Sequence, residues 1–360
     1  DNMAVNLEKV VENFSVKAGI VPYGNGHIND TYLREGNPGY ILQRINTNVF
    51  KDPNSVMENI VNVTEYLRAE IVKNGGDPER ETMNVIKTKL GKNCYMADSN
   101  NYFRMYKFVS NSVSFDTAED SSLLFEAGKS FGKFQRMLDG FDAGLLHETI
   151  VDFHNTPKRI EQLEAAIKKN YENRAALVSA ELDAAKKYSK YASLITDAMA
   201  DGSIPSRVTH NDTKLNNVLF DKDTHKGICV IDLDTVMPGS ILYDFGDALR
   251  FGASSGAEDE TDLSKIYFDL EKYKSFSEGF LGEVGECLTK REIELLPESV
   301  IIMTYECGIR FLADYLNGDV YFKIHRENHN LDRARTQLKL VADMETKLDE
   351  MHRIAESFIK

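Results

Sequence analysis

The amino-acid sequence predicts an α+β protein of two lobes, in which a small lobe with a mainly antiparallel sheet precedes a large helical lobe. Strand-like segments dominate residues 20–109, and helical periodicity dominates the chain beyond residue 112. With 360 residues, the chain is also too long for one ordinary hydrophobic core. We therefore expect a first lobe over residues 1–109 and a second over residues 110–360, with a hinge where the last strand ends.

The first lobe is expected to combine two helices with a sheet. Residues 1–20 carry apolar residues at helical spacing, and residues 23–33 are typical of a hairpin whose glycines permit a tight turn. A capping box at residues 55–58 opens a helix that continues to about residue 73. Further strands are predicted over residues 39–45, 83–87 and 101–109.

The second lobe is predicted to be mainly helical. Its helical segments are 121–138, 157–170, 174–199, 262–283, 290–316 and 332–357. Two short strand-like segments, 204–209 and 227–231, interrupt this pattern. Because loops that leave strands can project side chains into a cleft, we expect the chemistry of the protein around these two segments.

Composition excludes several classes of function. The net charge of −14 argues against a nucleic-acid partner, which calls for clustered Lys and Arg. No apolar run approaches the length of a membrane span and no leader pattern opens the chain, so no membrane association is expected. The four cysteines are far apart in sequence and form no C-x-x-C pair, which favours free thiols in a reducing cytoplasm. No obligatory protein partner is evident.

The most informative motif is H-x-D-x-x-x-x-N, formed by His210, Asp212 and Asn217. This spacing is typical of the catalytic loop of protein kinases, in which the Asp accepts the proton of the substrate hydroxyl and the Asn binds Mg²⁺. We expect these roles for Asp212 and Asn217. The alternative is an ordinary polar loop, since Asn and Asp favour turns.

A second motif, Asp232-Leu233-Asp234, follows the apolar segment 227–231. A carboxylate at the end of such a strand is costly unless it binds a cation, so Asp232 is predicted to be a metal ligand. Asp234 is either a second ligand or a turn residue. The literal triplet at 244–246, Asp-Phe-Gly, follows a helix-like segment instead of a strand, so we assign it to bracing the catalytic loop.

The nucleotide is expected to bind the first lobe. The glycine hairpin at 24–26 suits a phosphate cover, although its third glycine is absent. Gln43 stands where a phosphate-binding lysine is expected, and Arg44 points to the opposite face of its strand. Either Gln43 donates to a phosphate or Arg44 swings in. The predicted nucleotide contacts are Gly24, Asn25, Gly26, Ile41, Gln43, Lys107 and Val109.

Together these motifs indicate a protein-kinase-like fold. The segments 22–29, 207–217, 232–240 and 306–316 resemble the aminoglycoside phosphotransferase and choline kinase superfamily and, within it, the N-acetylhexosamine 1-kinases. The similarity runs along almost the whole chain. It implies a cytoplasmic kinase that uses ATP and Mg²⁺ to phosphorylate the anomeric hydroxyl of N-acetylglucosamine and N-acetylgalactosamine.

The resemblance also implies residues that hold the sugar. Arg310 and Tyr321 would contact it together with Asp212, and His27 would add a further contact. On residue chemistry alone, Arg310 binds either a sugar hydroxyl or a nearby acid, Asp314 or Glu306. Tyr321 either packs on a sugar face or fills core space.

Two rival functions remain open at this point. A kinase for choline, an amino acid or an aminoglycoside would need an acidic receiving surface, which Glu258, Asp259, Glu260 and Asp262 provide if they are not simply a solvated loop. A nucleotide-binding pseudokinase is favoured by Gln43.

Overall fold

The computed structural model describes residues 5–16, 19–24 and 30–360. The chain forms two compact units, each drawn from three segments. The first unit comprises Asp1–Ser114, Met137–Val151 and Asn216–Pro238, and the second comprises Phe115–Arg136, Asp152–Leu215 and Gly239–Lys360. The segment that carries Asn217 and Asp232 thus groups with the first unit, while the lobe boundary at residue 109 stays a prediction.

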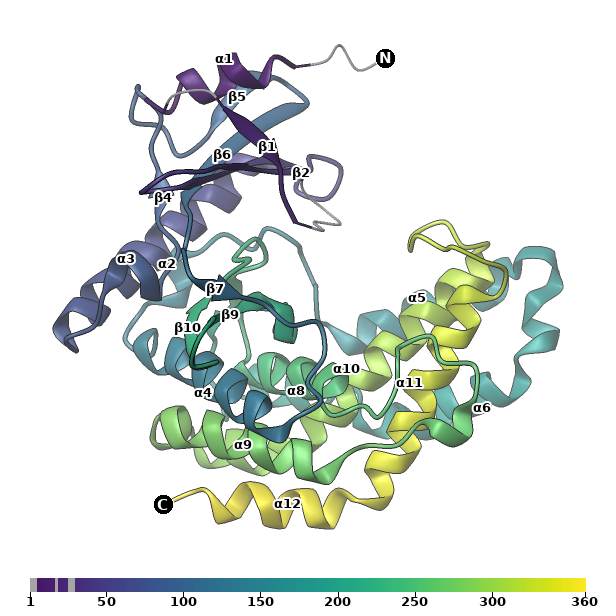
Figure 1. Ribbon diagram of the computed structural model, residues 1–360. Coiled ribbons are helices and arrows are strands. Elements are labelled where there is room, and N and C mark those ends of the chain that lie inside the picture. The colour runs from purple at the N-terminus through teal and green to yellow at the C-terminus, as the bar shows by residue number, and fades with distance from the viewer. Residues whose placement is uncertain (1–4, 17–18, 25–29) are drawn as a thin grey trace. The chain divides into compact units, whose positions relative to one another are not determined.

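The first unit is built on an antiparallel sheet (Figure 1). Its strands run in the order β1-β2-β3-β6-β4, with β5 also paired to β6. The strands are β1 (Ile20–Pro22), β2 (Asp30–Arg34), β3 (Tyr40–Ile45), β4 (Val85–Ile86), β5 (Tyr95–Asp98) and β6 (Asn101–Lys107). The antiparallel sheet is therefore confirmed, and β5 is a strand that the sequence analysis missed.

One face of this sheet is covered by helix α1 (Leu7–Glu12), which Asn6 caps by accepting hydrogen bonds from two backbone amides. The apolar spacing of the helix directs Val10 and Val11 onto the sheet. The core formed in this way consists of Val10, Val11, Phe14, Leu42, Phe103 and Met105.

Helix α2 (Pro53–Lys73) connects the sheet to the other segments of the first unit. It begins earlier than the predicted capping box, because Asp52 is the N-cap and accepts a hydrogen bond from the Ser55 amide at 3.3 Å. Its buried Asn59 donates to the carbonyl oxygens of His147 and Val236 at 2.8 and 3.1 Å. The remaining elements are α3 (Pro78–Glu81), η1 (Ala143–Leu145) and a second sheet of β7 (Ser112–Val113), β9 (Val218–Asp221) and β10 (Gly227–Val230).

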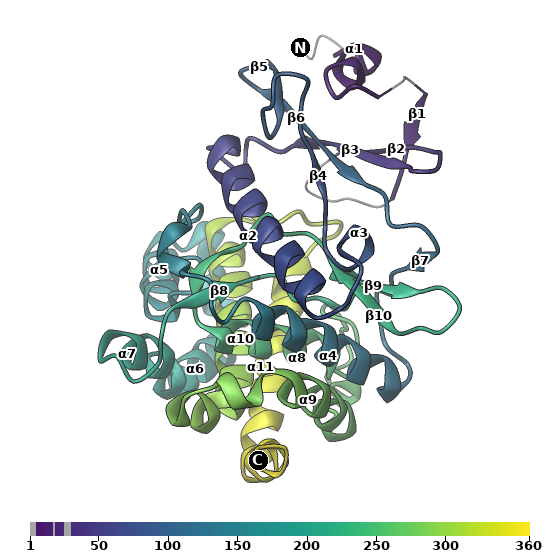
Figure 2. The same cartoon turned by 90° about the vertical axis from the view of Figure 1, so that its left-hand side faces the viewer.

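The second unit is helical, and its helices gather around α10 (Figure 2). Helix α10 contacts α5, α8, α11 and α12. The α-helices are α4 (Ser121–Met137), α5 (Thr156–Lys169), α6 (Ser179–Tyr188), α7 (Leu194–Ala200), α8 (Ile241–Gly252), α9 (Leu270–Val284), α10 (Lys290–Asn317), α11 (His329–Thr346) and α12 (Leu348–Ser357). Short elements are β8 (Arg207–Thr209), β11 (Met237–Gly239), η2 (Tyr171–Leu177), η3 (Ser189–Tyr191), η4 (Leu215–Asn217), η5 (Leu263–Lys265) and η6 (Gly285–Cys287).

Local signals fix both ends of α10. Thr289 and Glu292 form a reciprocal capping box at its start, and Gly318 ends it with a φ of +96°. The prediction of one long helix over residues 290–316 is confirmed. Three other predictions were wrong in detail. Residues 174–199 divide into α6, η3 and α7, residues 262–283 divide into η5 and α9, and the C-terminal helix breaks at Lys347.

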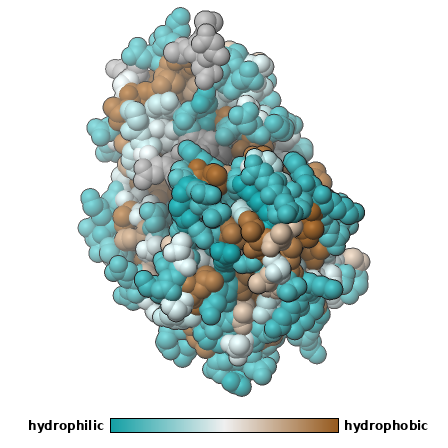
Figure 3. Space-filling model, turned by 90° about the vertical axis from the view of Figure 1, so that its right-hand side faces the viewer, coloured by the Kyte–Doolittle hydropathy of each residue, from teal (hydrophilic) through white to brown (hydrophobic). Residues whose placement is uncertain are grey.

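No helix in the described ranges is long and apolar enough to cross a membrane. Hydrophilic residues dominate the face of the molecule shown in Figure 3, where apolar residues form separate patches. The four cysteines are free thiols, and burial raises the pKa of both Cys229 and Cys307 to about 12. Because the thiolate is the reactive form, this shift favours the less reactive thiol at neutral pH.

Candidate active site

Asn217 and Asp232 lie at the same end of the β9–β10 hairpin. Val218 is opposite Val230 in this pair. The Ile231 amide then donates to the Asn217 carbonyl oxygen at 2.8 Å, so Asn217 directly precedes one strand and Asp232 follows the other. Asp232 has a φ of +57°, in the left-handed region that is uncommon for residues with a side chain.

The chemistry of these two side chains suits Mg²⁺. A carboxylate and an amide oxygen are the hard oxygen ligands that this ion prefers. Within the described part of the chain, no group of three or more His, Cys, Asp and Glu side chains comes together as a metal site. Mg²⁺ is usually held by one or two carboxylates together with substrate phosphates, so a small ligand set fits an ion that the nucleotide shares.

The side chain of Gln43 contacts a buried cation that the sequence analysis did not identify. Gln43 is opposite Arg104 in the β3–β6 pair, and the Arg104 Nε donates to the Gln43 Oε1 at 3.0 Å. Two other nitrogens of Arg104 contact the carboxylate of Asp234 at 2.5 and 2.9 Å. Arg44, in contrast, pairs with Asp30 at 2.5 Å. Asp234 is therefore engaged by Arg104, and Arg44 does not replace the missing lysine in this structure.

Ile41, Lys107 and Val109 lie at one end of the β3–β6 ladder. Ile41 is opposite Tyr106, the neighbour of Lys107. The Lys107 ammonium pairs with Glu79 at 2.9 Å. This arrangement brings three of the predicted nucleotide contacts close together, and their contact with a nucleotide stays a prediction.

The glycine hairpin is described only in part. Gly24 has a φ of +73°, a conformation that glycine adopts without strain. Asn25, Gly26 and His27 lie outside the described residues. Their predicted contacts with phosphate and sugar therefore remain predictions.

In the second unit, one buried carboxylate holds the catalytic loop. Asp244 of α8 accepts hydrogen bonds from the backbone amides of His210 and Asn211 at 2.9 and 2.8 Å. It also accepts one from the Gln135 side-chain amide at 2.7 Å, while Thr213 donates its hydroxyl to the Asp244 carbonyl oxygen at 2.7 Å. Burial raises the pKa of the Asp244 carboxyl. The catalytic loop is thus held both through its backbone amides and through the side chain of Thr213.

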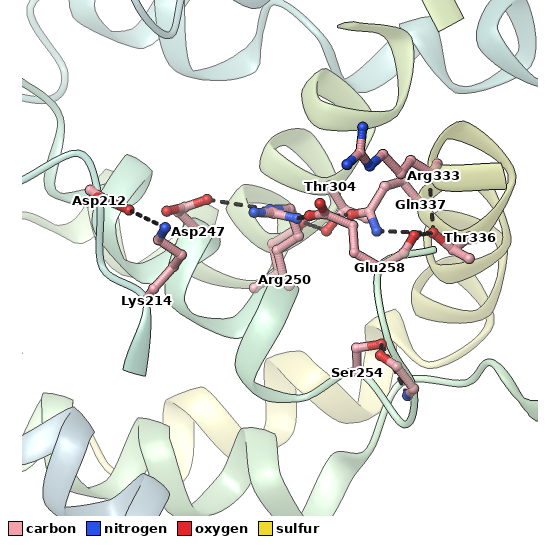
Figure 4. A network of polar contacts seen from close by, with 12 residues as sticks. Asp212, Lys214, Asp247, Arg250, Ser254, Glu258, Thr304, Arg333, Thr336 and Gln337 are labelled. Carbon is pink, nitrogen blue, oxygen red and sulfur yellow. Dashed lines mark hydrogen bonds and ion pairs between the residues drawn. The ribbon is translucent and has the colours of Figure 1, made fainter. Parts of the chain in front are cut away.

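Asp212 projects from this fixed loop, and its side chain is 26% exposed. Its backbone amide donates to the His210 Nδ1 at 3.1 Å. The His210 ring is fully buried against Phe131 and Phe134, with ring centroids 5.7 and 5.9 Å away. The Lys214 ammonium lies 3.7 Å from the Asp212 carboxylate (Figure 4). Asp212 therefore combines a fixed backbone with a carboxylate that a small hydroxyl compound can reach.

The Asp-Phe-Gly triplet at 244–246 belongs to helix packing. Phe245 is fully buried, in ring contact with Phe276 and Phe280. A Cβ on Gly246 would lie 2.3 Å from the Ser299 carbonyl oxygen, so only glycine allows α8 to approach α10 this closely. The expected bracing role of Asp244 agrees with its hydrogen bonds to the loop.

Arg310 of α10 has no hydrogen bond or ion pair within the part of the chain that the structure describes. Its guanidinium lies over the rings of Tyr321 and Phe322, 5.8 and 5.4 Å from their centroids. Tyr321 is 72% exposed, which excludes the alternative that it fills core space. The guanidinium therefore retains donors that a bound molecule can use.

The two acids named as possible partners of Arg310 are engaged elsewhere. Glu306 accepts hydrogen bonds from the His154 ring at 2.8 Å and the Thr156 hydroxyl at 3.1 Å. The Asp314 carboxylate accepts from the backbone amides of residues 320–322 at 3.1, 2.8 and 3.0 Å. Asp314 thereby holds the loop that carries Tyr321.

The acidic run at residues 258–262 is likewise engaged within the second unit. Glu258 pairs with Arg250 at 2.8 Å, in a network that also includes Asp247 and Gln337 (Figure 4). Asp259 contacts the His329 ring at 2.9 Å, and Asp262 caps η5. These acids stabilise the fold around α8 and α11.

Comparison with known proteins places this chemistry in a family. The model of a family described as the phosphotransferase enzyme family matches residues 19–276, which is more than half of the chain. The chain belongs to the phosphotransferase enzyme family. Its substrate is therefore a small molecule. The predicted membership of the aminoglycoside phosphotransferase and choline kinase superfamily is confirmed.

Solved structures show the same fold. A microcompartment-associated aminopropanol kinase superposes on the phosphotransferase with a TM-score of 0.66 and 15% identity, covering 96% of this chain and 98% of that one. An aminoglycoside phosphotransferase from Alicyclobacillus acidocaldarius gives a TM-score of 0.63 at 11% identity, covering 99% and 98%. A spectinomycin phosphotransferase gives 0.57 at 15% identity, covering 96% and 98%. The predicted protein-kinase-like fold is confirmed.

The sequence did not reveal the role of Arg104, the buried cation beside Gln43 and Asp234. Arg104 stood within an aromatic-rich predicted strand, and an isolated arginine among apolar residues was the only local signal. Its pairing with Gln43 depends on strand register, which the sequence pattern did not give. The engagement of Asp234 was missed for the same reason.

Proposed function

We propose that the phosphotransferase is an ATP- and Mg²⁺-dependent kinase that phosphorylates the anomeric 1-hydroxyl of N-acetylglucosamine or N-acetylgalactosamine. The resemblance of four segments to N-acetylhexosamine 1-kinases supports this acceptor. Proteins of the same fold include a spectinomycin phosphotransferase in complex with ADP and an amicoumacin kinase in complex with AMP-PNP and Ca²⁺, which supports the nucleotide and the divalent metal. The four free thiols agree with a cytoplasmic location.

The residues of the chain account for each part of the reaction. Asp212 accepts the proton of the sugar hydroxyl while the hydroxyl oxygen forms a bond to the γ-phosphorus. The bond from that phosphorus to the bridging oxygen breaks, and ADP leaves. Asn217 and Asp232 would hold Mg²⁺, which offsets the phosphate charge when it is bound.

The observation that carries the choice of acceptor is the guanidinium of Arg310, which has no hydrogen bond or ion pair with any residue that the structure describes. Arg159 is close enough that burial first, and then the charge of Arg310, lowers the pKa of Arg159. An acceptor with an ammonium group would bring a third positive charge to these two. A neutral sugar instead offers hydroxyl and carbonyl oxygens to the guanidinium donors and a ring to the exposed face of Tyr321.

The acidic run argues against the amine kinases as models for the acceptor. Aminopropanol and ethanolamine kinases share the fold, and the substrates in their names are amines. In this chain, Glu258 and Asp259 are engaged by Arg250 and His329. Two of the four acids of this run therefore already have a basic partner, which argues against an acidic surface reserved for a cation.

A coupled assay of ADP release tests the proposal. The acceptors are N-acetylglucosamine, N-acetylgalactosamine, glucosamine, choline, aminopropanol and an aminoglycoside, each with ATP and Mg²⁺. We expect turnover with the two N-acetylated sugars, and phosphorus NMR should show the phosphate at position 1. Turnover confined to the amines, or phosphate at position 6, would contradict the proposed acceptor.

The variant Asp212→Asn separates an enzyme from a nucleotide-binding pseudokinase. We expect it to bind ADP with the parent affinity and to lose turnover, because only the proton acceptor is removed. A parent protein that binds ADP but phosphorylates none of the acceptors would favour the pseudokinase.

A further inference from the structure

The first unit contains a buried guanidinium in place of the lysine expected at position 43. Arg104 is 2% exposed, and its Nε and both terminal nitrogens are engaged by Gln43 and Asp234. The Gln43 amide nitrogen continues the chain of contacts to the Thr31 hydroxyl at 3.3 Å. A chain of contacts therefore runs from β2 through β3 and β6 to Asp234.

The charges around Arg104 explain why it is retained in the interior. A buried guanidinium is stable only with an acid partner, and the Asp234 side chain is 6% exposed. The charge of Asp232 also raises the pKa of Arg104, as an additional contribution to the larger one from Asp234. Arg104 thus pairs directly with Asp234, two residues along the chain from Asp232.

The segment from Ile231 to Val236 needs such an anchor because its backbone is strained. Asp232 adopts a φ of +57°, and residues in this region persist only where surrounding contacts fix them. The Ile231 amide bonds to Asn217 at one end of the segment, and the Val236 carbonyl accepts from Asn59 at the other. Asp234, between them, is held by Arg104.

We propose that Arg104 is a positioning residue for the metal-binding carboxylate of Asp232 and that it acts through Asp234. The proposal rests on the metal site of the proposed function and is independent of the acceptor. Asp234 is then a brace and not a second metal ligand.

The expected size of the effect follows from similar sites. Outer-shell partners of metal ligands typically alter metal affinity by about 10- to 100-fold when they are changed. Loss of the Arg104 guanidinium removes the two contacts that it makes with the Asp234 carboxylate and the positive charge that offsets it. We therefore expect Arg104→Met to weaken Mn²⁺ binding in the presence of ADP by at least about tenfold.

The test is a titration of the full-length protein with Mn²⁺ and ADP, followed by electron paramagnetic resonance, with thermal unfolding measured in parallel. The variants are Arg104→Met, Arg104→Lys and Asp234→Asn. The matched control is Arg44→Met on the neighbouring strand, since Arg44 pairs with Asp30 at a half-exposed position. The control should bind Mn²⁺ within about twofold of the parent, because Arg44 does not contact Asp234.

A double variant separates positioning from simple stabilisation. Arg104→Met with Asp234→Leu replaces the buried ion pair by apolar side chains, a change that often restores stability. We expect it to unfold at a higher temperature than Arg104→Met and to retain weak Mn²⁺ binding. Recovery of Mn²⁺ affinity together with stability would show that the pair is only structural, and would overturn the proposal.

The single variants provide the remaining outcomes. Tighter Mn²⁺ binding by Arg104→Lys or Arg104→Met would identify Asp234 as a metal ligand that Arg104 masks, and would also overturn the proposal. If Arg104→Met does not fold, Asp234→Asn carries the test, and unchanged Mn²⁺ affinity would refute the positioning role. No sugar is present in this titration. A lack of turnover with the sugars would therefore contradict the proposed function, whereas an unchanged Mn²⁺ affinity of the variants would contradict the role of Arg104.

Discussion

The bracing of the catalytic loop by Asp244 leads to the sharpest prediction about activity. Asp244→Asn keeps the shape of the side chain and replaces one carboxylate oxygen by an NH₂ group. One oxygen of the carboxylate accepts from both His210 and Gln135, and the other accepts from Asn211. The variant keeps only one of these oxygens. Its NH₂ group would therefore face the backbone N–H of either His210 or Asn211.

The magnitude follows from these contacts. If the remaining oxygen keeps its two bonds, the variant loses one hydrogen bond to a charged group, worth about 1.5–3 kcal/mol. It also leaves the buried Asn211 amide unsatisfied, which costs about 1–3 kcal/mol. Burial of the parent carboxylate offsets part of this sum, because it raises the pKa of Asp244 and so penalises the ionised form. We expect a net destabilisation of about 2–4 kcal/mol.

The activity of Asp244→Asn should fall by more than its loss of stability alone would cause. A shift of about 1 Å in a positioned catalytic group can reduce the rate by about a hundredfold, so we expect kcat to fall at least about tenfold at a temperature where the variant is folded. The measurements are urea unfolding followed by circular dichroism and steady-state ADP release. Glu283→Gln is the control, because it removes only a surface ion pair with Arg136 and should cost less than about 1 kcal/mol.

Two results would refute this reasoning. A kcat within about twofold of the parent would show that the loop does not depend on the carboxylate. A loss of Mn²⁺ affinity comparable to that of Asp232→Asn would show that the triplet at 244–246 contributes a metal ligand after all. We expect the Mn²⁺ affinity of Asp244→Asn to remain that of the parent.

The remaining predictions concern pH, the acceptor and packing. Burial raises the pKa of Asp244 in the folded state above its ordinary value of 3.8. The stability that this group contributes is therefore complete below pH 3.8 and is lost as the pH rises through the raised pKa. In urea titrations, the unfolding free energy of the parent minus that of Asp244→Asn should fall over this pH window. Arg310→Met should raise KM for the sugar by about tenfold or more and leave ADP affinity unchanged, because we propose that the guanidinium binds the sugar and not the nucleotide. Arg207→Met removes the salt-bridge partner of the fully buried Glu292 and should lower the unfolding free energy by about 3–5 kcal/mol without changing KM for ATP. Gly246→Ala should destabilise by at least about 3 kcal/mol, since its Cβ would meet the Ser299 carbonyl oxygen at 2.3 Å, whereas an unchanged melting temperature would contradict the close packing of α8 on α10.

Local signals allowed the sequence to predict the elements that depend on neighbouring residues. The periodic spacing and the termini of α10 lie within the segment itself, and the long helix was predicted to within one residue. The segment 174–199 has similar periodicity, yet η3 and the turn before Leu194 divide it. Periodicity reports which face is apolar, and it does not report where the chain changes direction to cover α10.

The same distinction applies to the candidate site. Asp212 and Asn217 could be proposed as site residues because their spacing is local, and the strand before Asp232 is visible in the sequence. Asp244 was assigned correctly to bracing because it follows a helical segment. Arg104 was missed because its role depends on Gln43, from which it is separated by 61 residues along the chain.

The contact between Arg104 and Gln43, which are far apart along the chain, bears on how the site can lack its expected lysine. Two carboxylates, Asp232 and Asp234, lie in a largely buried segment, and such groups require a compensating positive charge wherever it originates. The β3–β6 register places Arg104 directly opposite position 43, so an arginine on one strand supplies a charge near the place where a lysine on the other is expected. A glutamine at position 43 is then compatible with catalysis, because its side chain accepts a hydrogen bond from the arginine and helps to fix it. Under the proposed role of Arg104, Gln43 no longer distinguishes a pseudokinase from an enzyme, and the comparison of the parent protein with Asp212→Asn does.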